Sequence, residues 1–293
     1  MADISEYISV QAKLISERLN VLLNTNMNSV VADAMRYSAE GGGKRIRPLL
    51  TLEFSKVCSG NLSAALDFGC ALEMIHTYSL IHDDLPCMDD DGMRRGKPSC
   101  HIAFGEDNAL LAGDALLTRA FGVLSGVTEL PAENIVKAVR VLSDFAGIDG
   151  MVGGQVLDLQ FENTSPAAED IVKMYSLKTC ALLKASAVLG CLTSESCSDG
   201  TISAACEYGE NIGLAFQIVD DILDIIGDGE KLGKPIGSDS KNDKSTLVSI
   251  YGIDKAKELA DELTQKAISA LEKLDGDTHI LKEIALMLAD RTF

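Results

Sequence analysis

The chain has 293 residues, of which 46% are hydrophobic and 24% are charged, with 44 acidic and 26 basic side chains and a net charge of −18 at pH 7. The hydrophobic fraction is high enough for a packed core and excludes intrinsic disorder. The negative charge makes nucleic acid and anionic membranes poor partners, because both repel an acidic protein.

Apolar residues recur at helical spacing along most of the chain. This period predicts helices near residues 4–24, 28–38, 48–58, 62–84, 107–125, 132–146, 150–162, 167–193, 199–227 and 253–290. Turn-forming residues separate the segments, and few stretches alternate as strands do. No linker divides the chain into two compositions. We therefore predict one all-α domain over residues 1–293, with about ten helices around a common centre.

The N-terminal sequence MADISEYISVQAKLISERLN lacks the basic and apolar regions of a secretory signal. No stretch reaches the roughly 18 uninterrupted apolar residues of a membrane span. We therefore expect a cytoplasmic protein without membrane association. The eight cysteines are scattered and include no CxxC pair, so we interpret most of them as small buried hydrophobic residues rather than zinc or redox groups.

Two aspartate clusters directly follow helical, strongly apolar sequence. Asp220 and Asp224 are four residues apart, so their carboxylates would project from one helix face about 6 Å apart. Asp83 and Asp89 would point away from each other on a regular helix, but Pro86 predicts a kink or bulge that returns Asp89 towards Asp83. A solvated helix face is the alternative. The apolar flanks instead favour carboxylates at the mouth of a cavity.

Carboxylates at a cavity mouth favour a hard divalent cation. Neither cluster contains two Cys or two His residues, so its oxygen ligands favour Mg²⁺ over zinc. Magnesium typically takes one or two carboxylates together with substrate phosphate. An EF-hand is excluded, because aligning Gly92 with the loop glycine puts Cys87 at the first ligand position and Pro98 at the twelfth.

Basic residues concentrate in two glycine-containing loops. The first reads GGGKRIRP over residues 41–48, and the second reads MRRGK over residues 93–97. Backbone N–H groups in such loops can face an anion together with the cationic side chains, which suits a diphosphate. A surface patch that only balances charge is the alternative. The GxxxxGK[ST] motif of a nucleotide-binding P-loop is absent, so a nucleotide is not implied.

In chain order the sequence contains GGGKRIRP, DDLPCMDDDGMRRGKPS, GGQVLDL, a Lys-Thr pair, FQIVDDILD and LGKPIGSDSKNDKST. Over about residues 41–252 this set resembles the trans-isoprenyl diphosphate synthases, or polyprenyl synthetases, and EMIHTYSLIHDDLP is most similar to bacterial farnesyl diphosphate synthases. The resemblance implies the isoprenoid synthase fold, antiparallel helices around a central cavity, and a homodimer. It also implies a prenyltransferase that adds isopentenyl diphosphate head to tail to dimethylallyl and geranyl diphosphate, giving (E,E)-farnesyl diphosphate and diphosphate.

The resemblance further implies a role for each residue at a matching position. The ligands of about three Mg²⁺ ions would be Asp83, Asp84, Asp89, Asp220, Asp221 and Asp224. Isopentenyl diphosphate would bind at Gly43, Lys44, Arg47, His76 and Arg95, and the allylic diphosphate at Arg94, Lys178, Lys234 and Lys244. Thr179 and Gln217 would lie beside the allylic carbon, and Gln155 and Asp158 would line the cavity. The residues implied in catalysis are Asp83, Asp84, Asp89, Lys178, Thr179, Gln217 and Asp220.

The implied chemistry is consistent with these residue types. Breaking the allylic carbon–oxygen bond leaves a carbocation and diphosphate, and metal ions with Lys and Arg stabilise the charge on the leaving group. The cation then meets the double bond of isopentenyl diphosphate, and the departed diphosphate is a reasonable base for the lost proton. The Thr179 hydroxyl and the Gln217 amide oxygen could shield the cation without capturing it. Gln217 could also be a buried amide bonded to the backbone.

Only the motif match makes His76 a binding residue, and we interpret His82 as structural. Tyr78 and Ser79, five and four residues before Asp83, resemble the floor of the family's product pocket, where a bulky ring would stop the chain at farnesyl. Ordinary helix packing is the alternative for Tyr78. The spacing in DDLPCMD suits plant-type geranylgeranyl diphosphate synthases equally well.

Three further alternatives are a non-catalytic isoprenoid-binding subunit, a terpene cyclase and an acidic helical protein without an active site. Both aspartate motifs are complete, which counts against a non-catalytic subunit. A cyclase would lack GGGKRIRP and would carry an Asn/Ser/Glu metal motif in place of DDILD. An acidic protein without a site would not explain basic and acidic loops in this order.

Overall fold

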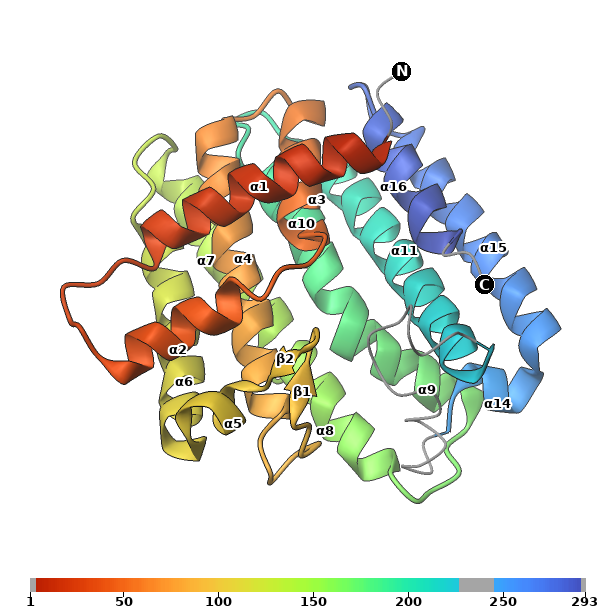
Figure 1. Ribbon diagram of the computed structural model, residues 1–293. Helices are drawn as coiled ribbons and strands as arrows, with labels where there is room; N and C mark the ends of the chain where they lie inside the picture. The colour runs from red at the N-terminus through yellow and green to blue at the C-terminus, as the bar shows by residue number, and fades with distance from the viewer. Residues whose placement is uncertain (1–3, 227–244, 291–293) are drawn as a thin grey trace.

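The computed structural model describes residues 4–226 and 245–290, and this part of the chain is almost entirely helical (Figure 1). The helices of the first half are α1 (Ile4–Leu22), α2 (Val30–Ala39), α3 (Ile46–Val57), α4 (Leu62–Asp83), α5 (Cys100–Phe104), α6 (Glu106–Ser125) and α7 (Ala132–Ala146). Strands β1 (Met93–Arg94) and β2 (Lys97–Pro98) form a short antiparallel hairpin between α4 and α5. The predicted all-α class is confirmed.

The second half adds helices and one π-helical segment. These are α8 (Met151–Phe161), α9 (Ala168–Tyr175), the π-helix η1 (Ser176–Cys180), α10 (Ala181–Cys191), α11 (Asp199–Ile226), α14 (Leu247–Tyr251), α15 (Ile253–Leu271) and α16 (His279–Ala289). The single helix predicted over 253–290 is wrong, because the chain turns between α15 and α16, where Gly276 packs against α3. A Cβ atom on Gly276 would lie 2.3 Å from the carbonyl oxygen of Val57.

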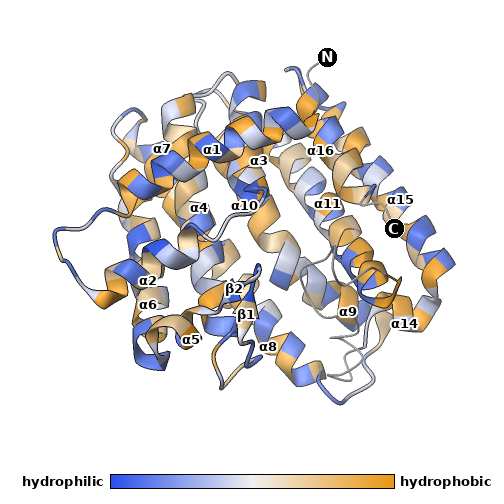
Figure 2. Ribbon diagram, viewed as in Figure 1, coloured by the Kyte–Doolittle hydropathy of each residue, from blue (hydrophilic) through white to orange (hydrophobic). Residues whose placement is uncertain are grey.

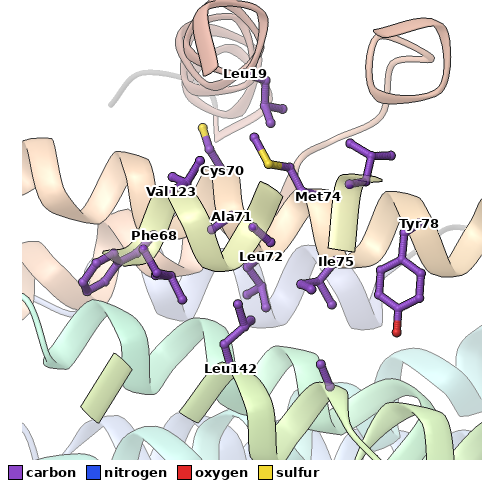
Figure 3. Packing of buried hydrophobic residues seen from close by; sticks show 14 of the residues in the cluster. Leu19, Phe68, Cys70, Ala71, Leu72, Met74, Ile75, Tyr78, Val123 and Leu142 are labelled. Atoms are coloured by element: carbon purple, nitrogen blue, oxygen red, sulfur yellow. The ribbon is translucent and has the colours of Figure 1, made fainter. Parts of the chain in front are cut away.

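Helix α4 lies at the centre of the molecule, between α3, α6 and α10, and has buried residues on every side. A helix that is apolar all round belongs in a core. Figure 3 shows Cys70 and Met74 of α4 pointing towards Leu19 of α1. On the opposite side of α4, Leu72 faces Leu142 of α7 (Figure 3). The outer helices are amphipathic instead, and Figure 2 shows hydrophilic and hydrophobic residues alternating around α1 and α15.

Glycines bring α8 and α11 unusually close to η1. A Cβ atom on Gly154 of α8 would lie 2.1 Å from the backbone nitrogen of Lys178, and one on Gly213 of α11 would lie 2.6 Å from the Sγ atom of Cys180. No side chain fits in either place. The two close contacts therefore place the polar residues that follow these glycines on α8 and α11 beside η1.

No helix among the described residues is long and apolar enough to cross a lipid bilayer. The cytoplasmic location stays a prediction.

Candidate active site

The first aspartate cluster lies where α4 ends. Pro86 has no N–H group for a helical ladder, and the helix ends at Asp83. The chain then turns back, so that the backbone N–H of Asp89 donates to the carbonyl oxygen of Asp83 at 2.9 Å. The predicted return of Asp89 towards Asp83 is confirmed, although a helix end with successive turns replaces a kink inside the helix.

Asp84 forms an ion pair with Arg94. The Nε atom of Arg94 donates to both carboxylate oxygens of Asp84 at 2.8 Å, and Nη2 donates to one of them at 2.6 Å. Only 2% of the Asp84 surface is exposed. The β1–β2 hairpin, which the sequence did not predict, carries Arg94 to this position. Asp84 therefore holds the hairpin against the end of α4.

Burial dominates the electrostatics of Asp83. It raises the pKa of Asp83 to about 6, with Lys178 opposing this shift and Asp89 adding to it. A half-buried carboxylate beside a second one is costly unless a cation neutralises them. Both groups offer only oxygen atoms, which are the ligands that Mg²⁺ prefers. The donor chemistry at this position therefore fits the predicted metal.

Lys178 and Thr179 both lie in the π-helix η1, which the sequence did not predict. Such segments are frequent at functional sites. The Nζ atom of Lys178 forms an ion pair with Oδ2 of Asp158 at 2.6 Å, and Asp158 follows Gly154 by one turn on α8. Thr179 Oγ1 donates to Oε1 of Gln217 on α11 at 3.0 Å. The π-helix thus joins α8 to α11 through two adjacent side chains.

The second aspartate cluster follows Gln217 on α11. Gln217 Nε2 donates to Oδ1 of Asp221 at 3.1 Å, and the hydroxyl of Tyr175 donates to Oδ2 at 2.5 Å. Only 4% of Asp221 is exposed. Asp220 and Asp224 are both partly exposed and lie one turn apart, on the face that their spacing predicted. The cluster is therefore divided between one buried, hydrogen-bonded carboxylate and two that are partly exposed.

A cavity of about 350 Å³ lies between α4, α8 and η1. Asp83, Lys178 and Thr179 are among the side chains that line it. Its other lining residues include Tyr78, Ser79, Met88, Met151, Val152, Gln155, Val156 and Leu159. Most of the α8 residues were missed from the sequence, where GGQVLDL alone indicated that α8 reaches the cavity. The lining of this space combines apolar side chains with polar and charged ones.

A second cavity, of about 410 Å³, lies under the GGGKRIRP loop. Its lining residues include Gly43, Lys44, Arg45, Glu73, Arg94, Arg95 and Phe216. The two cavities share Arg47, His76 and Leu80 as lining residues, so they adjoin one another. The residues predicted to bind isopentenyl diphosphate line this second cavity, and Lys178, predicted to bind the allylic diphosphate, lines the first. Arg94 was also predicted to bind the allylic diphosphate, but it lines the second cavity.

The common wall contains a cation and a neutral imidazole. The Nε atom of half-buried Arg47 has no hydrogen-bond partner among the described residues. Burial, with the positive charge of Arg47, keeps the pKa of His76 well below its usual range. His76 is therefore uncharged at neutral pH and can donate one hydrogen bond without adding a charge.

Two residues that line the second cavity, Arg45 and Glu73, were not singled out from the sequence. Arg45 Nη1 forms a buried ion pair with Oε1 of Glu73 at 2.7 Å, and Arg45 also donates to the carbonyl oxygen of Ala39. Arg95 donates to the carbonyl oxygen of Gly42. Gly43 has a φ of +117°, which L side chains rarely adopt, so the loop favours glycine there. These contacts fix the loop that carries Lys44 and Arg47.

The remaining predicted residues have simple positions. Ser79 donates to the carbonyl oxygen of His76 at 2.9 Å. His82 hydrogen-bonds with the carbonyl oxygen of Leu110 at 3.1 Å and packs edge-on against Tyr78, which supports its interpretation as a structural residue. Lys234 and Lys244 lie outside the described residues.

Comparison with known proteins agrees with this geometry. The polyprenyl synthetase family model matches residues 28–284. The chain is 41% identical over 287 residues to the geranylgeranyl diphosphate synthase of Cyanophora paradoxa, covering 97% of this chain and 95% of that protein. It is 39% identical over 291 residues to the farnesyl diphosphate synthase of Bacillus subtilis strain 168, covering 98% of each chain.

Solved structures share the fold. The geranylgeranyl pyrophosphate synthetase from Pyrococcus horikoshii Ot3 matches with a TM-score of 0.90 and 33% sequence identity, and the match covers 98% of each chain. The family match spans most of the sequence, and the relatives are similar over nearly their whole length. The chain therefore belongs to the polyprenyl synthetase family and is a trans-prenyl diphosphate synthase, a prenyltransferase with the isoprenoid synthase fold.

Proposed function

We propose that the protein is a Mg²⁺-dependent farnesyl diphosphate synthase. It would condense isopentenyl diphosphate with dimethylallyl diphosphate and then with geranyl diphosphate. The observation that carries this proposal is the pair of adjoining cavities, one lined by Asp83 and Lys178 and the other lined by Lys44 and Arg95. Two anionic substrates can then bind in adjacent spaces, with their diphosphates held by different residues.

The first cavity would take the allylic substrate with its diphosphate at the aspartates. Asp83 and Asp89, with Asp220 and Asp224, would hold Mg²⁺, which neutralises negative charge on the diphosphate when bound. Asp84 and Asp221 would instead position Arg94 and Gln217, because both carboxylates are buried and hydrogen-bonded.

Lys178 and Thr179 would act on opposite sides of the bond that breaks. Asp158 holds the Lys178 ammonium, which can donate to the departing diphosphate as its charge develops. The Thr179 hydroxyl donates a hydrogen bond to Gln217, so a lone pair of the hydroxyl oxygen is free to face the carbocation. A neutral hydroxyl stabilises the cation without a strong nucleophile that would trap it.

The second cavity would bind isopentenyl diphosphate. Lys44, Arg47 and Arg95 supply positive charge there, and neutral His76 supplies a hydrogen-bond donor. Because Arg47 and His76 also line the first cavity, the bound double bond would lie next to the allylic carbon. The departed diphosphate would accept the proton that is lost, as the nearest strong base.

The test is mass spectrometry of the products that purified protein makes from Mg²⁺, isopentenyl diphosphate and either dimethylallyl or geranyl diphosphate. Farnesyl diphosphate as the end product would support the proposal. A twenty-carbon product would favour a geranylgeranyl diphosphate synthase, the activity named for several relatives. No condensation would favour a non-catalytic isoprenoid-binding subunit. The homodimer, the single domain and the number of Mg²⁺ ions stay predictions.

Tyr78→Ala is expected to lengthen the products. Tyr78 is 7% exposed and lines the first cavity five residues before Asp83, on the side of α4 that faces away from Leu19 (Figure 3). Removal of the ring would open space for at least one more isoprene unit. Product mass spectrometry would show the shift, and Tyr78→Phe, which keeps the ring, should still stop at farnesyl. An unchanged pattern in Tyr78→Ala would show that the ring is not the floor.

Mg²⁺ and inorganic diphosphate together are expected to raise the melting temperature far more than either alone. The crowded carboxylates need a cation, and the diphosphate supplies further ligands to the same ion, so each strengthens the binding of the other. Thermal melts with Mg²⁺, diphosphate or both would measure this. Asp83→Asn should lose the cooperative part of the shift. Additive shifts would contradict a shared site.

A further inference from the structure

Three cysteines that are remote in sequence meet at the end of the helices opposite the aspartates. Cys58 caps the C-terminus of α3, Cys191 is the last residue of α10, and Cys197 precedes the start of α11. Their Sγ atoms all lie within 4.8 Å of one another. Asp220 follows on α11 about 30 Å further along the helix axis, so this thiol cluster is separate from the diphosphate sites.

Close backbone packing holds the first two thiols in place. A Cβ atom on Gly190 would lie 2.5 Å from the carbonyl oxygen of Thr51, so α10 touches α3 one residue before Cys191. The turn after Cys58 packs just as closely against the loop that follows α10. A Cβ atom on Gly60 would lie 2.1 Å from Oγ1 of Thr193. Neither thiol can move far without separating these two helices.

Hydrogen bonds fix the loop that carries the third thiol. The backbone N–H of Asn61 donates to the carbonyl oxygen of Thr193 at 3.0 Å, and Ser55 Oγ and Thr193 Oγ1 are 2.7 Å apart. The Asn134 amide donates to the carbonyl oxygens of Leu192 and Ser194 at 2.9 and 3.2 Å. The cluster is therefore organised before any ligand binds, which lowers the entropic cost of binding.

The spacing of the sulfur atoms matches a metal–thiolate centre. Sulfur atoms bound to one tetrahedral Zn²⁺ at about 2.3 Å lie roughly 3.8 Å from one another. Cys191 is buried, whereas Cys58 and Cys197 are partly exposed, so an ion could enter and keep one position open to water. All three belong to, or pack against, the same apolar cluster.

We propose that Cys58, Cys191 and Cys197 form a three-thiolate site for a soft d¹⁰ cation, with Zn²⁺ as the ion bound. Thiolates favour such ions over Mg²⁺, which prefers oxygen ligands, so the two kinds of site would not compete. The bound ion would join the ends of α3 and α10 to the start of α11. Those helices also carry Arg47 and Gln217, and the ion would therefore brace the scaffold behind both cavities.

The test uses full-length, metal-free protein kept reduced, with Zn²⁺ alone as the ligand and excess Mg²⁺ present to occupy the carboxylates. Equilibrium dialysis with elemental analysis should show one Zn²⁺ per chain. Cys197→Ser should bind it at least about 100-fold more weakly, a larger loss than removal of an outer hydrogen-bond partner causes. Cys206→Ser is the matched control, because Cys206 is also half-buried but lies outside the cluster.

Cobalt(II) supplies a readout specific for sulfur. Bound in place of Zn²⁺, it should give a thiolate-to-cobalt charge-transfer absorption in the wild-type protein and in Cys206→Ser, and a much weaker one in Cys197→Ser and in Cys58→Ser. Both substituted positions are partly exposed, and circular dichroism would confirm that the variants are folded. No Zn²⁺ uptake by the reduced wild type, or equal uptake by Cys197→Ser, would overturn the proposal.

Discussion

Asp83→Asn is expected to abolish condensation and, at the same time, to stabilise the ligand-free protein at neutral pH. Burial raises the pKa of Asp83 to about 6, above its unfolded value of 3.8. The folded state therefore binds the Asp83 proton more tightly than the unfolded state does. The contribution of this group to the free energy of unfolding falls as the pH rises from about 4 to about 6. Above about pH 6 the ionised carboxylate destabilises the folded state, and the neutral amide of Asn removes this effect.

After allowance for solvent screening, the gain at pH 7.5 is about 1 kcal/mol, or about 3 °C in melting temperature. At pH 4 the gain should shrink, because Asp83 is then largely protonated in the folded protein. The turnover number should fall at least about 1,000-fold, since loss of one electrostatic group at a developing charge commonly costs 100- to 1,000-fold and a metal ligand costs more. Thermal melts and steady-state assays would measure both effects.

Asp84→Asn is the matched control, one residue away. Its carboxylate accepts both Nε and Nη2 of Arg94, so the amide would leave that guanidinium poorly paired and should lower the melting temperature at pH 7.5. A rise in melting temperature for Asp83→Asn and a fall for Asp84→Asn would distinguish a carboxylate that needs a bound cation from one that is already paired with Arg94. A destabilised Asp83→Asn, or one with wild-type turnover, would contradict the assignment.

Arg47→Met is expected to raise the KM for isopentenyl diphosphate about 100-fold, the effect of losing a hydrogen bond to a charged group with a free energy of nearly 3 kcal/mol. Its buried Nε atom has no partner among the described residues, and burial lowers the pKa of the guanidinium. The cation is thus poorly compensated without substrate. Replacement by an apolar side chain of similar length should leave the stability unchanged or increase it.

Arg45→Met, two residues earlier in the same motif, should have the opposite effect on stability. Arg45 and Glu73 form a buried ion pair, and breaking such a pair from one side costs about 3 to 5 kcal/mol. The Arg45→Met variant should therefore melt at a much lower temperature than the wild-type protein. Steady-state kinetics with each substrate varied, beside thermal melts, would distinguish the two arginines. An Arg47→Met variant with an unchanged KM for isopentenyl diphosphate would refute its role in binding.

The local sequence pattern correctly predicted the helices and which residues share one helix face. The apolar period predicted the all-α class, and the four-residue spacing of Asp220 and Asp224 placed both on one side of α11. Pro86 correctly indicated that the chain turns after Asp83. These features depend on residues within a few positions of one another, and the sequence records such relations directly.

The ordered motifs also identified the family from the sequence alone, because each motif keeps its own local spacing. They did not distinguish the buried, hydrogen-bonded aspartate of each cluster from the partly exposed ones. Asp84 and Asp221 have the same side chain as their neighbours, and only the packing of the β1–β2 hairpin and of Tyr175 turns them inward. The π-helix η1 was missed as well, because no period in the sequence distinguishes it from the helices on either side.

The sequence by itself determined the helical class and the family, and it predicted the residues proposed above to carry the chemistry. Only the tertiary structure decided that Arg47 and His76 form the wall between two cavities, and that Cys58 lies beside Cys191 and Cys197. The physical reason is that a helix face is set by backbone geometry over a few residues. Contacts between remote helices depend instead on how closely they pack, which glycines such as Gly154 and Gly190 control.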